Sequence, residues 1–138
     1  MISLVLVSHS RTLVEGLRDM VAQVAGDDVR VTTAGGTGDG RLGTSAPLIT
    51  EALLAAIGGP DGRADGVLVL LDLGSAALSL ELALEELDPW DRAIVRVSDG
   101  PLVEGAIVAA VESSVGSSLD DVERAAAGAM SLPKMPKA

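Results

Sequence analysis

Short apolar runs alternate along the chain with longer stretches in which apolar residues recur every three or four positions. The first run, residues 2–7, is continuous, which is typical of a strand buried on both faces of a parallel sheet. The run VLVLL at residues 67–71 has the same character. Two shorter runs, residues 29–33 and 93–97, complete four predicted strands.

Helical spacing follows each of these runs. Helices are predicted at residues 12–24, 46–57, 76–87, 101–114 and 119–130. In the first of them Thr12 and Glu15 match the capping-box pattern. Its apolar positions are Leu13, Leu17, Met20, Val21 and Val24. Between the second helix and the third strand, GGPDGRADG at residues 58–66 predicts a turn.

Four strand-and-helix units predict an α/β fold: a small doubly wound, mostly parallel sheet with helices on both faces. In the common strand order 2-1-3-4, the chain reverses direction between the first and third strands, and ligands bind outside the carboxyl ends of those strands. With 138 residues in all, we expect one domain over residues 1–130 and a flexible tail or linker stub over residues 131–138.

The only histidine of the chain, His9, comes directly after the first predicted strand. Asp72 occupies the corresponding point after the third strand. If these strands are neighbours, the two side chains face each other roughly one strand spacing apart, ~4.8 Å. A carboxylate beside an imidazole fixes its tautomer and raises its basicity. A neutral imidazole is a competent nucleophile near neutral pH, so the pair predicts a histidine that accepts a phosphoryl group.

Groups suited to phosphate are expected around this pair. Helix N-termini at residues 10–13 and 74–77 would point free N–H groups at it. The glycine-rich stretch GGTGDGRLGTS, residues 35–45, opens at the end of the second strand and lets backbone approach a ligand closely. The candidate phosphate-binding residues are Ser10, Arg11, Gly36, Thr37, Thr44, Ser45, Gly74 and Ser75.

Structural interpretations of the same residues stay open. His9 could cap the first helix, and Asp72 could cap the helix that follows it. The glycine-rich stretch could be an ordinary loop, although Gly38, Gly40 and Gly43 formally match the dinucleotide pattern GxGxxG. Such readings correspond to two other functions: a non-catalytic nucleotide- or anion-binding module, and an interaction domain in which His9 is structural. Trp90 is most simply a packing residue under a turn, or else an anchor for a partner.

Composition narrows the classes of function. Ten basic and twenty acidic residues give a net charge of −10, which argues against nucleic acid as a partner. The absence of cysteine and the single histidine exclude disulfides and thiolate or all-histidine metal sites, so we expect no metal. No apolar run approaches the length that crosses a membrane, and nothing resembles a signal peptide, so we expect a cytoplasmic protein.

Four motifs resemble one known family. They are VSHSRTLVEG at residues 7–16, AGGTGDGRLGTSA at 34–46, LLDLGSAALSLELALE at 70–85 and SDGPLVEGAIVAA at 98–110. In order and spacing they resemble the phosphotransferase subunit (subunit M) of bacterial dihydroxyacetone kinases driven by the phosphoenolpyruvate:sugar phosphotransferase system (PTS). That domain is akin to the IIA component of mannose-type PTS transporters. The resemblance covers about residues 2–130.

The resemblance implies a phosphotransferase. The residue matching His9 accepts a phosphoryl group from phospho-HPr, and the residue matching Asp72 assists it. The acceptor is ADP held on the kinase L subunit, and the chain itself binds no cofactor beyond the phosphoryl group on His9. The alternative is an EIIA component that passes phosphate to a IIB transporter component; LDLGSAALS and GRLGTSA favour the kinase branch. Some relatives continue into HPr-like and enzyme I-like domains.

The resemblance also implies a homodimer. The residues themselves give a weaker indication of the same kind, because the last two predicted helices carry apolar stripes that one small sheet would not fully cover. These positions are Leu102, Ile107, Val108, Val111 and Val115.

Overall fold

The computed structural model describes residues 1–59 and 62–135 of the chain. Two residues of the predicted turn (60–61) and the last three of the predicted tail (136–138) lie outside the described residues. The elements, in chain order, are β1 Ile2–Ser8, α1 Arg11–Ala25, β2 Val31–Gly35, α2 Ala46–Ile57, β3 Gly58–Gly59, β4 Gly62–Arg63, β5 Gly66–Leu71, η1 Gly74–Ala76, α3 Ala77–Glu85, α4 Pro89–Arg92, β6 Val95–Val97, α5 Leu102–Ser114, α6 Leu119–Gly128 and η2 Ala129–Ser131.

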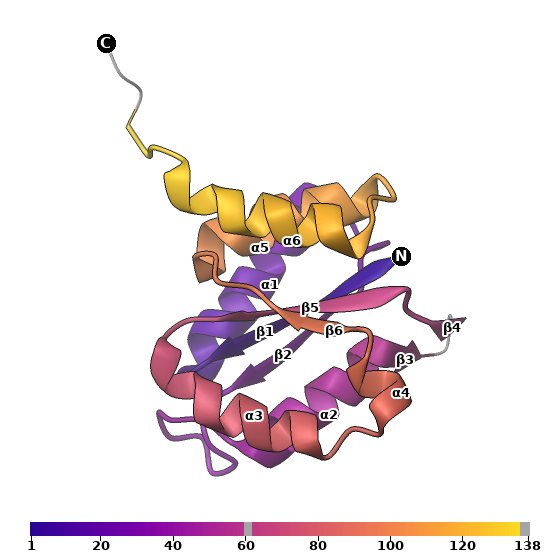
Figure 1. The fold of residues 1–138 in the computed structure, drawn as a ribbon. Coiled ribbons are helices and arrows are strands. Elements are labelled where there is room, and N and C mark those ends of the chain that lie inside the picture. Colours follow the sequence, from indigo (N-terminus) through magenta and orange to yellow (C-terminus); the bar gives the residue numbers. More distant parts are fainter. Residues whose placement is uncertain (60–61, 136–138) are drawn as a thin grey trace.

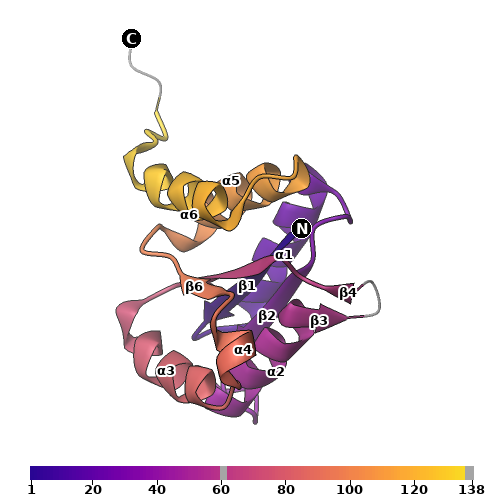
Figure 2. The same cartoon turned by 45° about the vertical axis from the view of Figure 1, so that its right-hand side comes forward.

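The main sheet has the strand order β2-β1-β5-β6, and all its pairs are parallel. This confirms the predicted α/β fold and its order, since β5 and β6 are the third and fourth predicted strands. Helices α1, α5 and α6 cover one face of the sheet, and α2 and α3 cover the other (Figures 1 and 2). Within the predicted turn, residues 58–59 and 62–63 form the two-residue antiparallel strands β3 and β4, and Gly66 already belongs to β5.

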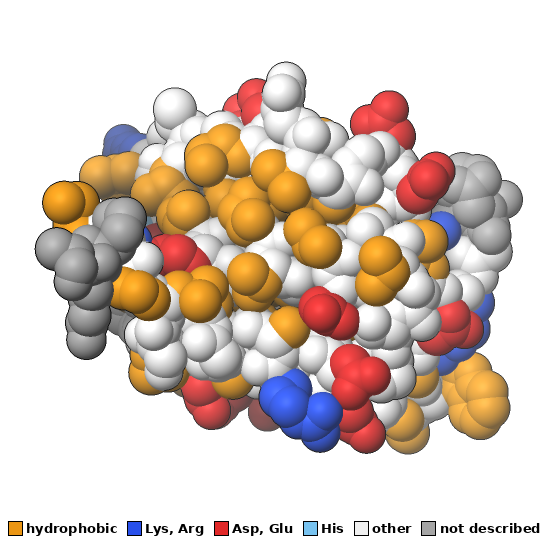
Figure 3. All heavy atoms as spheres, turned by 90° about the horizontal axis from the view of Figure 1, so that it is seen from above, with side chains coloured by type: hydrophobic (Ala, Val, Ile, Leu, Met, Phe, Trp, Pro, Cys, Tyr) orange, Lys and Arg blue, Asp and Glu red, His pale blue; other side chains and the backbone are white. Residues whose placement is uncertain are grey.

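The outer side of the α1, α5 and α6 layer carries exposed hydrophobic residues. Helix α1 buries Val14, Leu17 and Val21, whereas Leu13, Met20 and Val24 of the predicted stripe are exposed. Figure 3 looks onto this side of the molecule and shows hydrophobic side chains gathered over it. Helix α1 therefore carries apolar residues on more of its circumference than the sheet can cover.

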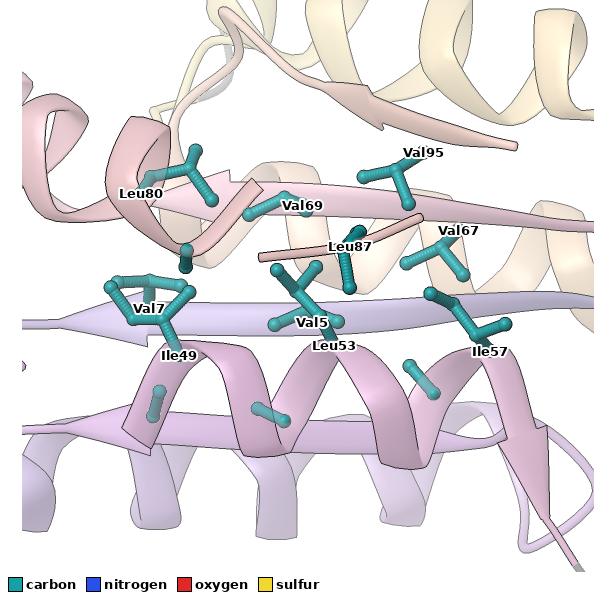
Figure 4. Close-up of a cluster of buried hydrophobic side chains, with 14 of the residues drawn as sticks. Val5, Val7, Ile49, Leu53, Ile57, Val67, Val69, Leu80, Leu87 and Val95 are labelled. Atoms are coloured by element: carbon teal, nitrogen blue, oxygen red, sulfur yellow. The ribbon is translucent and has the colours of Figure 1, made fainter. Parts of the chain in front are cut away.

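The interior consists of two apolar clusters, one on each face of the sheet. Successive residues of β1 point to opposite faces, so Val5 and Val7 belong to the cluster beneath α2 and α3, and Leu4 and Leu6 to the cluster beneath α1, α5 and α6. Figure 4 shows the first cluster, in which Leu53 of α2 faces the valines of the sheet. Because both faces are covered, all seven residues of β1 are buried, as its continuous apolar run predicted.

The start of α1 differs from the predicted capping box. Ser10 is the N-cap, and its hydroxyl accepts a hydrogen bond from the Leu13 N–H. The N-cap therefore lies two residues before the predicted Thr12 cap, the helix begins at Arg11, and Glu15 instead accepts a hydrogen bond from Arg11. A serine directly after His9 thus fixes where the first helix starts.

Trp90 does not pack under a turn, as the simplest interpretation expected. It lies on the short helix α4, which the pattern did not predict, and 75% of it is exposed. The Arg63 guanidinium stands 5.7 Å from the centre of its ring and also binds Asp91 at 2.5 Å. The helix shortens the last strand, which begins at Val95 and not at the predicted residue 93.

Candidate functional site

The carboxyl ends of β1, β2 and β5 meet at one edge of the sheet. The registers Ser8↔Gly35 and Val7↔Leu71 align the three ends. Gly35 allows the close fit, because a Cβ there would lie 2.6 Å from the Arg11 Cα. His9 follows β1, the glycine-rich loop follows β2 and Asp72 follows β5, so all three converge at the switch point of the topology.

The structure brings His9 and Asp72 into direct contact. The Nδ1 atom of His9 lies 3.0 Å from Oδ1 and 3.2 Å from Oδ2 of Asp72, and the backbone N–H of His9 donates to Oδ2 at 2.9 Å. The His9 side chain is 27% exposed and that of Asp72 is 15% exposed. An ionised carboxylate only accepts hydrogen bonds, so Nδ1 carries the proton of a neutral ring, and the lone pair is on Nε2.

Asp72 has two further partners. The Ser8 hydroxyl donates to Oδ2 at 3.0 Å and the Leu73 N–H to Oδ1 at 2.8 Å. Burial by itself would raise the pKa of the Asp72 carboxyl, but hydrogen bonds from His9 and Ser8 outweigh it and hold this pKa below its ordinary value. Asp72 is not the side-chain cap of the following helix, since η1 has no such cap. Its carboxylate is directed at His9.

Ser75 contacts the other nitrogen of the ring. Its Oγ lies 3.0 Å from Nε2 of His9. Because Asp72 keeps the proton on Nδ1, the Ser75 hydroxyl donates to the Nε2 lone pair. Each ring nitrogen therefore has one partner, and both partners come from the segment that follows β5.

The glycine-rich loop is attached to the site at both ends. At its start the Gly36 N–H donates to the Ser8 carbonyl at 3.1 Å, and Gly36 has a φ of +72°, which side chains rarely adopt. Near its end the Gly43 N–H donates to the His9 carbonyl at 2.9 Å. Thr44 Oγ1 then lies 2.6 Å from Ser79 Oγ, which ties the loop to α3.

Several other predicted phosphate-binding residues are engaged within the fold itself, as helix caps or in contacts with neighbouring side chains. Ser10 and Ser45 are the N-caps of α1 and α2, and the Arg11 guanidinium binds Glu15 at 3.0 Å. The Thr37 hydroxyl donates to Asp39 within its own loop. Gly74 is the first residue of η1. The phosphate-binding role of these residues stays a prediction.

The sequence interpretation did not identify Ser8 and Ser79. Ser8 is buried at the last position of β1, where its hydroxyl links the Ser10 N–H, at 3.0 Å, to the Asp72 carboxylate. A hydroxyl that ends an otherwise apolar strand is the signal that could have found it. Ser79 has no comparable signal, because it occupies an ordinary position on a helix.

Across residues 1–59 and 62–135, no three His, Cys, Asp or Glu side chains come together in a group that could hold a metal ion. None of the helices in this part of the chain has both the length and the apolar character needed to cross a membrane.

Comparison with known proteins gives a consistent family. The family model described as PTS system fructose IIA component (EIIA-man) matches residues 3–123. A Listeria innocua protein named PEP-dependent dihydroxyacetone kinase 2, phosphoryl donor subunit DhaM, is 43% identical over 122 residues, which are 88% of this chain and 94% of that protein.

Two further similar proteins are a longer relative and one with a solved structure. The phosphoryl donor subunit DhaM of the PEP-dependent dihydroxyacetone kinase of Escherichia coli K12 is 40% identical over 125 residues, and the match covers 88% of this chain but 25% of that protein. The crystal structure of a protein of unknown function, EF1359, superposes with a TM-score of 0.79 at 32% identity and covers 92% of this chain and 93% of the other.

Replacing Asp72 by asparagine is expected to change stability in a pH-dependent way. The native state holds the pKa of this carboxyl below that of the unfolded chain, so its contribution is complete above the unfolded value of about 4 and is lost as pH falls through the folded value. We expect Asp72→Asn to cost about 1–3 kcal/mol at neutral pH. The difference from the wild type should narrow below about pH 4.

Urea unfolding between neutral pH and about pH 3 measures this difference. Asp19→Asn, at an exposed position of α1, is the control and should stay close to the wild type throughout. A loss for Asp72→Asn that is the same at every pH would contradict the assignment of an ionised, hydrogen-bonded carboxylate.

Proposed function

The chain belongs to the EIIA-man family of PTS domains, and we propose that it is a cytoplasmic phosphohistidine carrier that serves a PEP-dependent dihydroxyacetone kinase. The observation that carries the proposal is the His9 ring, held through Nδ1 by Asp72 with Nε2 directed at a hydroxyl. The relatives named as phosphoryl donor subunits support the kinase as the destination.

The proposed chemistry is attack of Nε2 on the phosphorus of phospho-HPr. The Nε2 lone pair forms the new N–P bond while the bond between phosphorus and the donor breaks, and the electron pair of that bond returns to the donor atom. Positive charge that develops on the His9 ring is stabilised through its Nδ1–H by ionised Asp72. Positioning and charge stabilisation are what such transfers chiefly require of a protein.

Ser75 is proposed to follow the transferred group. Its hydroxyl releases the Nε2 lone pair as the N–P bond forms and donates to a phosphoryl oxygen. The N–H groups of Gly74 and Ser75 open the helical turn η1, and the first N–H groups of a helix have no partner within it. They are suited to the same anion.

Onward transfer is proposed to ADP on the L subunit of the kinase. The phosphoryl group then travels only as a covalent adduct of His9, and no bound cofactor or metal takes part. The alternative acceptor is the IIB component of a mannose-type transporter, to which the family description also applies. The names of the relatives favour the kinase.

A homodimer is proposed to form through the outer side of α1 and α5. These helices pack side by side, and both expose apolar residues there, namely Leu13, Met20 and Val24 on α1 and Val103 and Val111 on α5. The stripe expected from the sequence included Leu102, which is instead buried in the core. A second copy related by a two-fold axis would cover this surface with the same surface of its own.

Phosphoryl transfer from phosphoenolpyruvate, through enzyme I and HPr, tests the carrier role. The wild type should gain the mass of one phosphoryl group in acid-labile, base-stable form, and His9→Ala should gain none. Ser75→Ala should be labelled about 100-fold more slowly, because a donor to the transferring group is lost.

Circular dichroism confirms that each variant is folded. A folded wild type that is not labelled, or a His9→Ala variant that is labelled equally, would contradict the proposal. Discharge of the labelled protein by the ADP-loaded L subunit, but not by a IIB component, is the expected result for the kinase branch.

Sedimentation equilibrium tests the dimer. The wild type should sediment as a dimer, and Val111→Asp should shift it towards the monomer because a charge is then buried in an apolar contact. Leu54→Asp, on the exposed side of α2, is the control and should remain dimeric. A monomeric wild type, or equal behaviour of the two variants, would contradict the proposed interface.

A further inference from the structure

We propose that Thr44 and Ser79 are positioning residues for phosphoryl transfer to His9. Their hydroxyl pair holds the start of α3 against the glycine-rich loop, and this keeps Ser75 on Nε2 of the ring. Both residues act through Ser75, and neither has to touch the phosphoryl group. The inference rests on the proposed function, in which Ser75 donates to the group that is transferred.

The Thr44 end of the pair is attached to the backbone of the site. Thr44 follows Gly43, whose N–H donates to the His9 carbonyl at 2.9 Å. It precedes Ser45, the N-cap of α2, whose hydroxyl accepts a hydrogen bond from the Leu48 N–H at 3.3 Å. Because a hydrogen bond restrains the chain on each side of Thr44, its Oγ1 is a fixed point relative to the His9 backbone.

Ser79 uses its hydroxyl differently from most residues of its kind inside a helix. A serine or threonine there often donates to the carbonyl one turn earlier, as Thr50 of α2 does to Ala46 at 3.0 Å. The Ser79 Oγ instead lies 2.6 Å from Thr44 Oγ1, in the loop that runs beside α3 (Figure 1). Within the described part of the chain, this is the only hydrogen bond of either hydroxyl. The pair therefore serves the contact between loop and helix.

The start of α3 has few other attachments. No side chain caps η1 or α3. Leu73, Gly74 and Ser75 are all exposed, so packing contributes little to the position of Ser75 itself. Ala76 anchors the turn in the apolar core, and Ser79 supplies the polar contact towards the loop.

Helix α3 carries the restraint from Ser79 to Ser75, which lies one turn before it on the same side of the helix. The contacts form a closed circuit. It runs from the His9 backbone through the loop to Ser79, along α3 to Ser75, and back to Nε2 of the same histidine. The donor to Nε2 is thereby positioned relative to the residue that reacts. Displacing such a contact by ~1 Å can slow a reaction about 100-fold.

The first test removes each hydroxyl and leaves the rest of the side chain nearly unchanged. In Thr44→Val and in Ser79→Ala, transfer from phospho-HPr should show a kcat about 10-fold lower at unchanged KM, because the donor to the transferring group is misplaced. Thr44→Ser keeps the hydroxyl and should keep the wild-type kcat. The control Thr50→Val removes a hydroxyl that binds a carbonyl of its own helix and should leave both constants unaltered.

A second set of variants asks whether the pair acts through Ser75. In a Ser75→Ala background, Thr44→Val should slow transfer by less than about 2-fold, because the group that it positions is already gone. A further loss of about 10-fold in that background would show that the pair acts independently of Ser75, and it would overturn the proposal. An unchanged kcat in the single variants would overturn it as well.

The ¹⁵N resonance of Nε2 gives a readout that needs no phosphoryl transfer. His9 is the only histidine, and at alkaline pH an imidazole is neutral and carries a lone pair. Thr44→Val and Ser79→Ala should shift this resonance in the same direction as Ser75→Ala, because all three weaken the hydrogen bond to the lone pair. Thr50→Val should leave the resonance in place. An unshifted resonance in the first two variants would contradict the positioning role.

The two readouts separate this inference from the proposed function. If phospho-HPr does not label the wild type, the carrier role fails, and the ¹⁵N shifts alone decide whether the hydroxyl pair positions Ser75. If phospho-HPr labels the wild type and the Thr44→Val variant equally fast, the carrier role stands and the positioning role is contradicted.

Discussion

The Asp72 carboxylate is the interaction on which the site depends. It accepts four hydrogen bonds, two of them from His9, one from Ser8 and one from Leu73. These bonds connect the ends of β1 and β5, set the direction of the imidazole and keep the carboxylate ionised. An ionised carboxylate fixes the proton on Nδ1, and this fixes Nε2 as the nitrogen that can react.

The parallel sheet makes this contact available. Neighbouring parallel strands end at the same edge, so a residue after β1 and a residue after β5 are brought together although 63 positions separate them in the chain. Helices on both faces bury the central strands β1 and β5, and His9 reaches the surface beyond their carboxyl ends, at the switch point. The loop after β2 then closes over the backbone of His9 through Gly43. Fold and site are thus consequences of one topology.

The sequence predicted this arrangement well where a short-range pattern determined it. Apolar runs predicted the four parallel strands, and the common order of doubly wound sheets predicted how they are arranged. In that order the positions of His9 and Asp72 after two of the strands placed them at one edge. The sequence pattern did not predict the features that depend on packing between distant parts of the chain. The exposed side of α1 could not be separated from its buried side, because both are apolar, and Trp90 could not be placed without knowing that Arg63 covers its ring.

The contact between Ser75 and Nε2 and the link through Ser8 depend on side-chain directions, which residue spacing does not encode.

The most direct test of the account is the position of phosphorus on the imidazole ring. Since His9 is the only histidine, ¹H–¹⁵N NMR of the phosphorylated, ¹⁵N-labelled protein reports on this ring alone among histidines. The account predicts phosphorus on Nε2 and a proton on Nδ1. Phosphorus on Nδ1 would contradict it, because that nitrogen could not then donate to Asp72.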